Sequence, residues 1–189
     1  MILGRLPGPR QAPLLWASGA VSAMLLVWMN LGFVGAFAEL TGGRAMPDLD
    51  IDSTAQSLID LKRLLEARPE AAHVLRSMHL GPDLLLPAVL GLFLALLLRR
   101  VAPGARLYGR PAERLLPALL TMPVVYVAAD YAENIASILL FPPSLPEEAT
   151  ASLLATAIVW LTRLKFAALV ISGILVLRLA IGPRPTGAQ

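Results

Sequence analysis

The sequence predicts an all-α, polytopic membrane protein: a four-transmembrane-helix bundle with a short external amphipathic helix between the first two helices. Composition is the first reason, since 57% of residues are hydrophobic, only 15% are charged, and the mean hydropathy is +0.69. A soluble domain usually carries about 25% charged residues. The arginines also gather in short segments beside long apolar runs, which is typical of topology determinants rather than of a nucleic-acid-binding face. We therefore expect one membrane domain, residues 1–189, with membrane lipids as its partners and no nucleic acid.

Four apolar windows are long enough, or nearly long enough, to cross a bilayer as helices, which takes about 20 residues. The first has a competing interpretation, because two preceding arginines and the A-x-A sequence at residues 36–38 resemble a signal peptide. Its apolar run is longer than the 7–15 residues or so of a secretory signal, so we favour a retained anchor. The predicted transmembrane helices cover residues 14–38, 78–98, 115–141 and 153–181.

The second window is the weakest, because its uninterrupted apolar run covers only residues 84–98. Extending the helix toward the N-terminus gives it full length, but brings Arg76, His79 and Asp83 into its outer turns. Proline lacks a backbone N–H and its ring crowds the preceding turn. We therefore expect a bend near Pro82.

The loop at about residues 41–77 is the only sizeable segment predicted outside the bilayer. Three aspartates open it in a D-x-D-x-D pattern: Asp48, Asp50 and Asp52. The glycine and glutamate that a calcium-binding loop needs at fixed positions are missing, so we expect a solvated turn. A helix follows, with Ser53 and Gln56 as its capping box. Its leucine-rich face should lie on the membrane surface or over the mouth of the bundle.

Lysine and arginine counts predict the orientation, because the side richer in them faces the cytoplasm. Nine lie in the N-terminal arm, the second loop and the tail: Arg5, Arg10, Arg99, Arg100, Arg106, Arg110, Arg114, Arg178 and Arg184. The third loop has no lysine or arginine. The first loop has five: Arg44, Lys62, Arg63, Arg68 and Arg76. Both termini should therefore be cytoplasmic.

The third window carries polar residues at spacings of three and four, which places them on one helical face. They are Tyr126, Asp130, Glu133, Asn134 and Ser137. Asp130 falls near the middle of the window, where an ionised side chain costs roughly 2.5–3.5 kcal/mol. Because that cost calls for a partner, we expect this face to point into the bundle.

The fourth window supplies two cations, Arg163 and Lys165, which point away from each other because they are two residues apart. We favour Lys165 as the partner of Asp130, because the two should lie at similar depth. Arg163 could then reach Glu133 around the edge of the helix or extend outward to the interface. In the second helix, Arg76, His79 and Asp83 share one stripe, but one histidine and one carboxylate are too few to bind a metal. With no cysteine and no nucleotide- or metal-binding motif, we assign no metal and no cofactor.

These residues make the chain similar to a group of small bacterial four-helix membrane proteins of unknown function. The similarity covers about residues 53–181 and rests on Asp83 with Pro87, Asp130-x-x-Glu133-Asn134 and Thr162-x-x-Lys165. Arg163 is not part of that pattern. The resemblance implies the bacterial inner membrane and one shared site, but supplies no activity. The residues implied to form the site are Asp83, Asp130, Glu133, Asn134 and Lys165.

Three hypotheses about function remain open. In the first, the polar residues bind or move a small molecule, a lipid or a proton, and the site takes a small apolar or amphipathic ligand. In the second, the chain is a membrane enzyme that acts on a lipid or isoprenoid, with Glu133 or Asp130 as general acid or base. In the third, it is a non-catalytic accessory or assembly subunit. For the first two we expect a pocket between helices two, three and four that opens to the outside.

Overall fold

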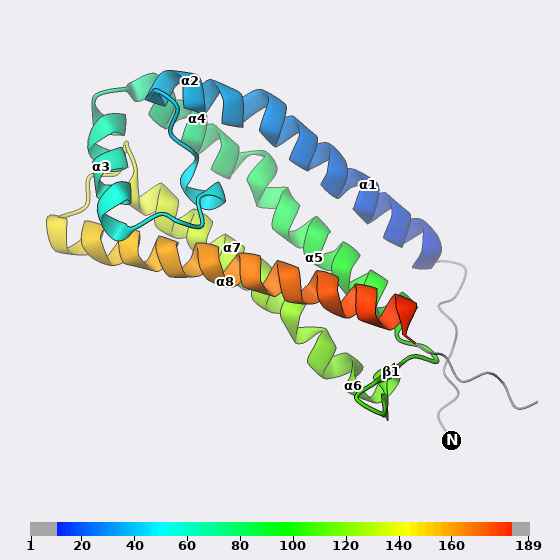
Figure 1. The fold of residues 1–189 in the computed structure, drawn as a ribbon. Helices are drawn as coiled ribbons and strands as arrows, with labels where there is room; N and C mark the ends of the chain where they lie inside the picture. The colour runs from blue at the N-terminus through cyan, green and yellow to red at the C-terminus, as the bar shows by residue number, and fades with distance from the viewer. Residues whose placement is uncertain (1–10, 183–189) are drawn as a thin grey trace, which may run out of the picture.

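The computed structural model describes residues 11–182, which form an all-helical bundle with one small hairpin (Figure 1). Four helical segments are long and apolar enough to cross a membrane. The all-helical class and the four helices of spanning length are therefore confirmed. The segments run over Ala12–Thr41, Pro69–Val101, Ala112–Leu140 and Glu148–Ile181.

The first segment lies along one side of the bundle and packs mainly against α5 (Figure 1). It ends at Gly42, whose positive φ of 73° turns the chain so that the Gly43 N–H donates to the Ala38 carbonyl at 2.7 Å, a common form of helix C-cap. Asn30 lies on the exposed side and donates to Leu26 of its own helix, so it takes no part in the polar interior. The elements are α1 (Gln11–Met29), a π-helical turn η1 (Asn30–Val34) and α2 (Gly35–Thr41).

The second segment is bent as predicted. The break lies at Gly81, immediately before Pro82, which occupies the first position of the following helix where no backbone N–H is needed. A short 3-10 turn and one more helix lie between the first and second segments. The elements are η2 (Pro47–Leu49), α3 (Ala55–Glu66), α4 (Pro69–Leu80) and α5 (Pro82–Val101).

The amphipathic helix predicted in the first loop is α3, which lies across one end of the bundle against α8 and α4 (Figure 1). We call this the α3 end. The predicted cap is wrong by one residue: Thr54 and Ser57 form the capping box, not Ser53 and Gln56. Ser53 instead belongs to the preceding turn, where its N–H donates to the Asp50 carbonyl. The buried stripe of α3 consists of Leu58, Leu61 and Leu65.

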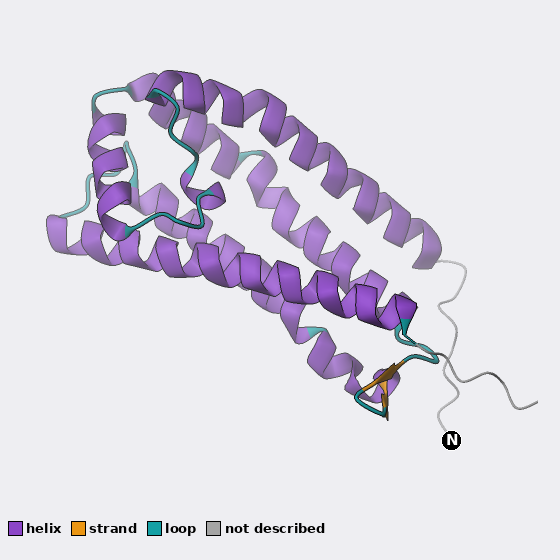
Figure 2. Cartoon of the chain, in the orientation of Figure 1, coloured by secondary structure: helices purple, strands orange, loops and turns teal. Residues whose placement is uncertain are grey.

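The opposite end carries a two-stranded hairpin (Figure 2), and we call it the hairpin end. Its turn residues Tyr108 and Gly109 both have positive φ, 50° and 75°, the conformation that two-residue hairpin turns favour. The helix that follows breaks after Leu119, because Pro123 cannot donate to that carbonyl. The elements are β1 (Arg106–Leu107), β2 (Arg110–Pro111), α6 (Ala112–Leu119), α7 (Thr121–Leu140) and α8 (Glu148–Ile181).

Close packing of α7 against α8 and of α5 against α7 brings the three polar helices together. Gly91 allows the approach of α5, because a Cβ there would collide with the Val127 side chain. Apolar clusters fill the two ends of the bundle. On α7 and α8 the buried polar residues fall between these clusters.

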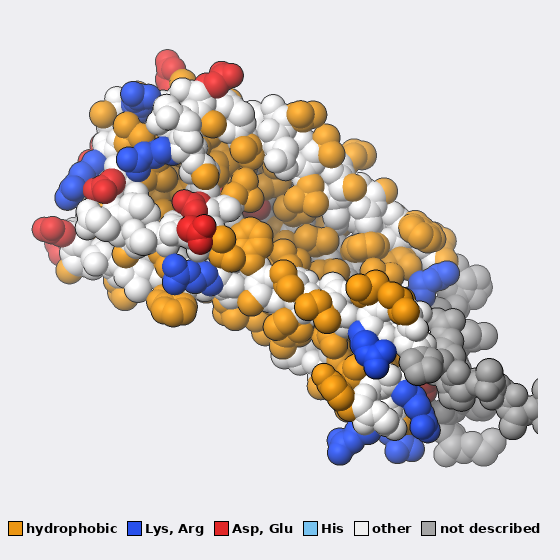
Figure 3. Space-filling view, viewed as in Figure 1, with side chains coloured by type: hydrophobic (Ala, Val, Ile, Leu, Met, Phe, Trp, Pro, Cys, Tyr) orange, Lys and Arg blue, Asp and Glu red, His pale blue; other side chains and the backbone are white. Residues whose placement is uncertain are grey.

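Hydrophobic side chains cover the middle of the bundle surface, and charged side chains gather at its two ends (Figure 3). Large apolar side chains such as Trp160 and Leu153 are more than 60% exposed. A monomeric soluble protein rarely exposes so much contiguous apolar surface. The exposed arginines at the hairpin end are Arg99, Arg100, Arg106, Arg110, Arg114 and Arg178.

Candidate functional site

The polar face predicted on the third helix is buried in α7 and points toward α8 and α5. A spacing of three and four residues places its members along one stripe, and each is at most 3% exposed. The predicted common face is therefore confirmed. Its residues are Tyr126, Asp130, Glu133, Asn134 and Ser137.

Lys165 of α8 lies between two carboxylates of this face. Its Nζ is 2.9 Å from Asp130 Oδ1 and 2.6 Å from Glu133 Oε2. The pairing with Asp130 is the one that helical phase predicted, whereas the second contact, to Glu133, was not foreseen. One buried ammonium group therefore serves two acids.

The Glu133 carboxyl group has a further partner in Thr162. Thr162 Oγ1 lies 2.6 Å from Glu133 Oε1 and 2.8 Å from the Ile158 carbonyl oxygen. A threonine hydroxyl has one proton to donate but can accept two hydrogen bonds. Both short contacts are satisfied together when Glu133 is protonated: Glu133 then donates to Thr162, and Thr162 donates to Ile158.

Arg163 does not reach Glu133, which corrects one of the sequence-based alternatives. Its guanidinium group points to the opposite side of α8 and stacks 5.5 Å from the Trp160 ring. From there its Nε donates to the Ile51 carbonyl and its Nη2 to the Ser53 carbonyl, both at 3.4 Å. Arg163 therefore ties the loop before α3 to the bundle.

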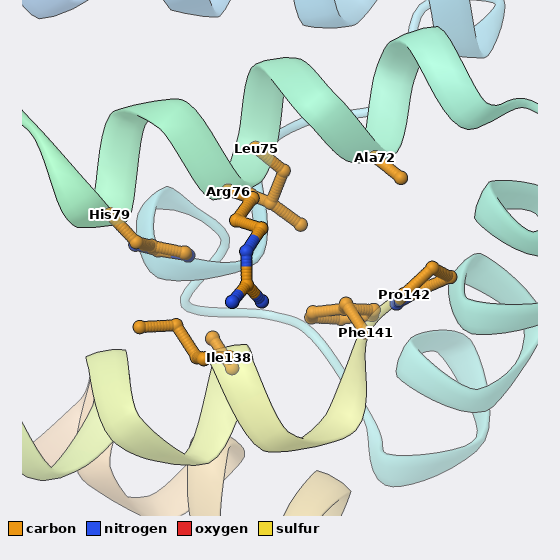
Figure 4. Close-up of a pocket in the computed structure, with 8 residues that line it drawn as sticks. Ala72, Leu75, Arg76, His79, Ile138, Phe141 and Pro142 are labelled. Atoms are coloured by element: carbon orange, nitrogen blue, oxygen red, sulfur yellow. The ribbon is translucent and has the colours of Figure 1, made fainter. Parts of the chain in front are cut away.

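The stripe on the second helix divides at the bend. His79 and Asp83 are both buried, with His79 Nδ1 3.1 Å from Asp83 Oδ2. Arg76 is half-buried, and its guanidinium group extends from α4 toward Ile138 and Phe141 (Figure 4). His79 and Asp83 therefore belong to the buried site, and Arg76 lies at its edge.

Pro87 explains how Asn134 is held. Proline cannot donate to the carbonyl four residues earlier, which leaves the Asp83 carbonyl without its helical partner. Asn134 Nδ2 donates to that oxygen at 3.4 Å, and Tyr131 Oη donates to the next carbonyl, Leu84, at 2.8 Å. Neighbouring helices satisfy carbonyls freed by proline in this way in membranes. The pattern Asp83, Pro87 and Asn134 therefore describes one connected arrangement.

Asp48 is the site residue that the sequence analysis missed. The predicted solvated turn is wrong for this aspartate, which is 2% exposed, but right for Asp52, which is exposed. Burial raises the pKa of Asp48, and the nearby Lys165 and His79 oppose that rise. The signal was the apolar pair Met46 and Pro47 directly before it, because a loop that buries such a pair carries the next side chain inward.

Several buried polar atoms near this site have no hydrogen-bond partner among the described residues. Buried polar groups are otherwise nearly always paired, with protein or with ordered water. The site therefore needs bound water, protons or a ligand to be satisfied. The atoms include Asp48 Oδ1, His79 Nε2, Asp130 Oδ2, Asn134 Oδ1 and Ser137 Oγ.

A small pocket, which we call the inner cavity, lies between α4 and the end of α7 (Figure 4). Its volume is about 10 Å³, room for about one water molecule. The predicted pocket between helices two, three and four therefore differs from this one, which α8 does not line. The lining residues are Ala72, Leu75, Arg76, His79, Ser137, Ile138, Phe141 and Pro142.

Comparisons with known protein families, with curated proteins and with solved structures find no match for this chain. Within residues 11–182, no three histidine, aspartate or glutamate side chains are grouped so that they could hold a metal ion. Any functional inference therefore depends on the proton and charge chemistry of the site itself.

Proposed function

We propose that this chain is a multi-pass membrane protein that binds and releases protons at a buried acid cluster. The acid cluster consists of four carboxyl groups, from Asp48, Asp83, Asp130 and Glu133. Lys165 and His79 are its two basic partners. If all four acids were ionised, at least two negative charges would remain even with the histidine protonated.

Such an excess of charge is costly inside a bundle. Two like charges about 4 Å apart repel by roughly 4 kcal/mol at an effective dielectric constant of 20, and desolvation adds to the cost. The cluster lowers this energy by retaining protons at neutral pH. Proton binding is therefore the chemistry that this group of residues supports best.

The observation that carries the proposal is the Thr162 hydroxyl between two acceptors. One hydroxyl proton cannot serve both Glu133 Oε1 and the Ile158 carbonyl, although both lie within 2.8 Å. A proton on Glu133 resolves the conflict. Asp130 then remains as the carboxylate that balances Lys165.

Infrared spectroscopy of the purified protein tests this directly, because a protonated carboxyl group absorbs apart from an ionised one. We expect a protonated-carboxyl band at neutral pH that disappears in Glu133→Gln and shifts in Thr162→Val. The matched control is Glu70→Gln, at an exposed site on α4, which should leave the band unchanged. A wild-type spectrum with no such band at pH 7 contradicts the proposal.

We also propose that the α3 end faces the outside of a bacterial inner membrane and that both termini are cytoplasmic. Six exposed arginines gather at the hairpin end, where α1 begins and α8 ends (Figure 1). Arginine-rich loops are retained in the cytoplasm. This orientation makes α3 and the loop before it an external cover over the acid cluster.

The second candidate is a purely structural role, in which the buried polar residues only join the helices of an accessory subunit. The observation that favours it is their burial, since none is more than 6% exposed: Asp130, Glu133, Asn134 and Lys165. In that case a pH change should release or bind no protons at these residues. The double variant Asp130→Asn with Lys165→Met separates the two. A purely structural seam loses nothing but stability, whereas a functional cluster also takes up protons over a different pH range, because Glu133 and Asp48 lose the neighbouring charge of Lys165. The enzyme hypothesis stays a prediction. Asp130 and Glu133 are both buried, so a lipid substrate would reach them only if the helices moved apart.

A further inference from the structure

We propose that protons enter the acid cluster from the α3 end through one water site between α4 and α7, with His79 as the relay to Asp83. This inference rests on the proposed function and adds the route, the side of entry and the residues that form it. It assigns the inner cavity to water and protons rather than to an organic ligand.

The first observation is a pair of neighbouring pockets at the α3 end. A larger hollow of about 330 Å³, which we call the outer hollow, is open at the surface between α3 and α4. It shares three lining residues with the inner cavity: Ala72, Arg76 and Pro142. Only the Arg76 side chain is long enough to stand between the two spaces. The two spaces therefore adjoin at Arg76, and this is where the proposed route passes from one to the other.

The second observation is the polar lining of the inner cavity. His79 and Ser137 are each 1% exposed, and neither His79 Nε2 nor Ser137 Oγ has a partner within the described part of the chain. Arg76 adds a third polar group, directed between α4 and α7 (Figure 4). A buried water needs two to four polar partners and about 10–15 Å³ of space. The cavity, at about 10 Å³, fits one water and excludes an organic solute.

The third observation is that His79 faces this cavity and the acid cluster with different nitrogens. Nδ1 lies 3.1 Å from Asp83 Oδ2, so a neutral ring that donates Nδ1–H to Asp83 leaves the Nε2 lone pair free to accept a proton. When the water delivers a proton to Nε2, the ring becomes doubly protonated and can release the Nδ1 proton to Asp83. The net result is one proton added to Asp83 and a neutral ring that now carries its proton on Nε2.

Other charged groups face His79 from every side and affect this transfer. Burial of His79 disfavours a charged ring, and Arg76 on its own helix adds to that cost; Asp83 on α5, Asp48 in the loop and Glu133 on α7 act in the opposite sense. The three carboxyl groups therefore offset part of the cost of charging the ring. From Asp83 the proton enters the group of acids around Lys165.

Stopped-flow pH jumps with an indicator dye test the route on the full-length protein in detergent micelles. Wild type should take up protons rapidly. Ser137→Val fills the inner cavity and removes one water partner, so uptake should slow at least tenfold while the total number of protons bound stays unchanged. His79→Gln should slow it similarly and lower the total by no more than the proton of the imidazole itself. Ser172→Val is the matched control, at a buried serine of α8 that bonds only its own helix, and should exchange at the wild-type rate.

The measurements separate the proposed proton route from proton binding itself. Wild-type rates in both Ser137→Val and His79→Gln overturn the route while leaving proton binding intact. A wild type that takes up no protons overturns the proposed function instead. If His79→Gln does not fold, Ser137→Val alone decides, and ¹⁵N NMR of the two histidines gives a further readout. The His79 Nε2 signal should exchange with water, and the Ser137→Val substitution should remove that exchange.

Discussion

Removing the carboxylates around Lys165 one at a time should show that this lysine has two partners. Asp130→Asn alone leaves Glu133 2.6 Å from the ammonium group, and Glu133 can release its proton and take over the ion pair. The combined change Asp130→Asn with Glu133→Gln leaves Lys165 without either neighbour. The double variant should therefore be far less stable than the two single variants imply.

The magnitude follows from the geometry. At 2.9 Å and an effective dielectric constant of 20, the ion pair attracts by about 6 kcal/mol before desolvation is subtracted. Uncompensated burial of one partner typically costs about 3–5 kcal/mol, which we expect for the double variant. Each single variant should cost only about 0.5–1.5 kcal/mol, the net worth of a typical hydrogen bond, because the remaining acid keeps Lys165 paired. Adding Lys165→Met to the double variant should recover most of the loss, because no buried charge is left.

Unfolding in mixed micelles, followed by tryptophan fluorescence, measures these differences. Arg63→Met is the matched control, since Arg63 pairs with Asp60 on the exposed side of α3, and it should cost about 0.5 kcal/mol or less. Strictly additive single and double variants would show that the two acids act independently of each other. A triple variant as unstable as the double would show that the lysine is not the group left uncompensated.

Three further predictions concern other parts of the chain. Because burial raises the pKa of Asp48, its contribution to folding is complete below about pH 4 and is lost as the pH rises through the raised pKa. Asp48→Asn should therefore gain stability relative to wild type with rising pH. Parallel stability curves for Asp48→Asn and wild type would refute this. Asn134→Ala should cost about 1–3 kcal/mol, because it leaves the Asp83 carbonyl unpaired. The cost should be smaller in a Pro87→Ala background, where residue 87 regains the backbone N–H that pairs with this carbonyl. A double-mutant cycle in unfolding assays measures the difference, and equal costs in both backgrounds would exclude the bond between Asn134 and Asp83. A reporter fused to the C-terminus should read cytoplasmic, and an external signal would reverse the proposed orientation.

The sequence by itself determined the helices and the polar face of the third one. A bilayer admits only segments that satisfy their own backbone, so length and hydropathy are enough to find spanning helices. Helical periodicity then places Asp130, Glu133 and Asn134 on one side, and the cost of a buried charge requires a cation at similar depth. For that reason the contact between Asp130 and Lys165 could be predicted without knowledge of the tertiary structure.

Only the tertiary structure decided what the loops contribute. Arg163 binds the Ile51 carbonyl across 112 positions of sequence, and Asp48 enters the site from the same loop. No local period or composition encodes such contacts, because they depend on how a short turn packs against helices that lie far away in the chain. The same holds for Glu133, the second acid that Lys165 contacts. That contact depends on the distance between α7 and α8 rather than on helical phase. Periodicity fixes which way a side chain points along its own helix, whereas its neighbours are set by packing between elements.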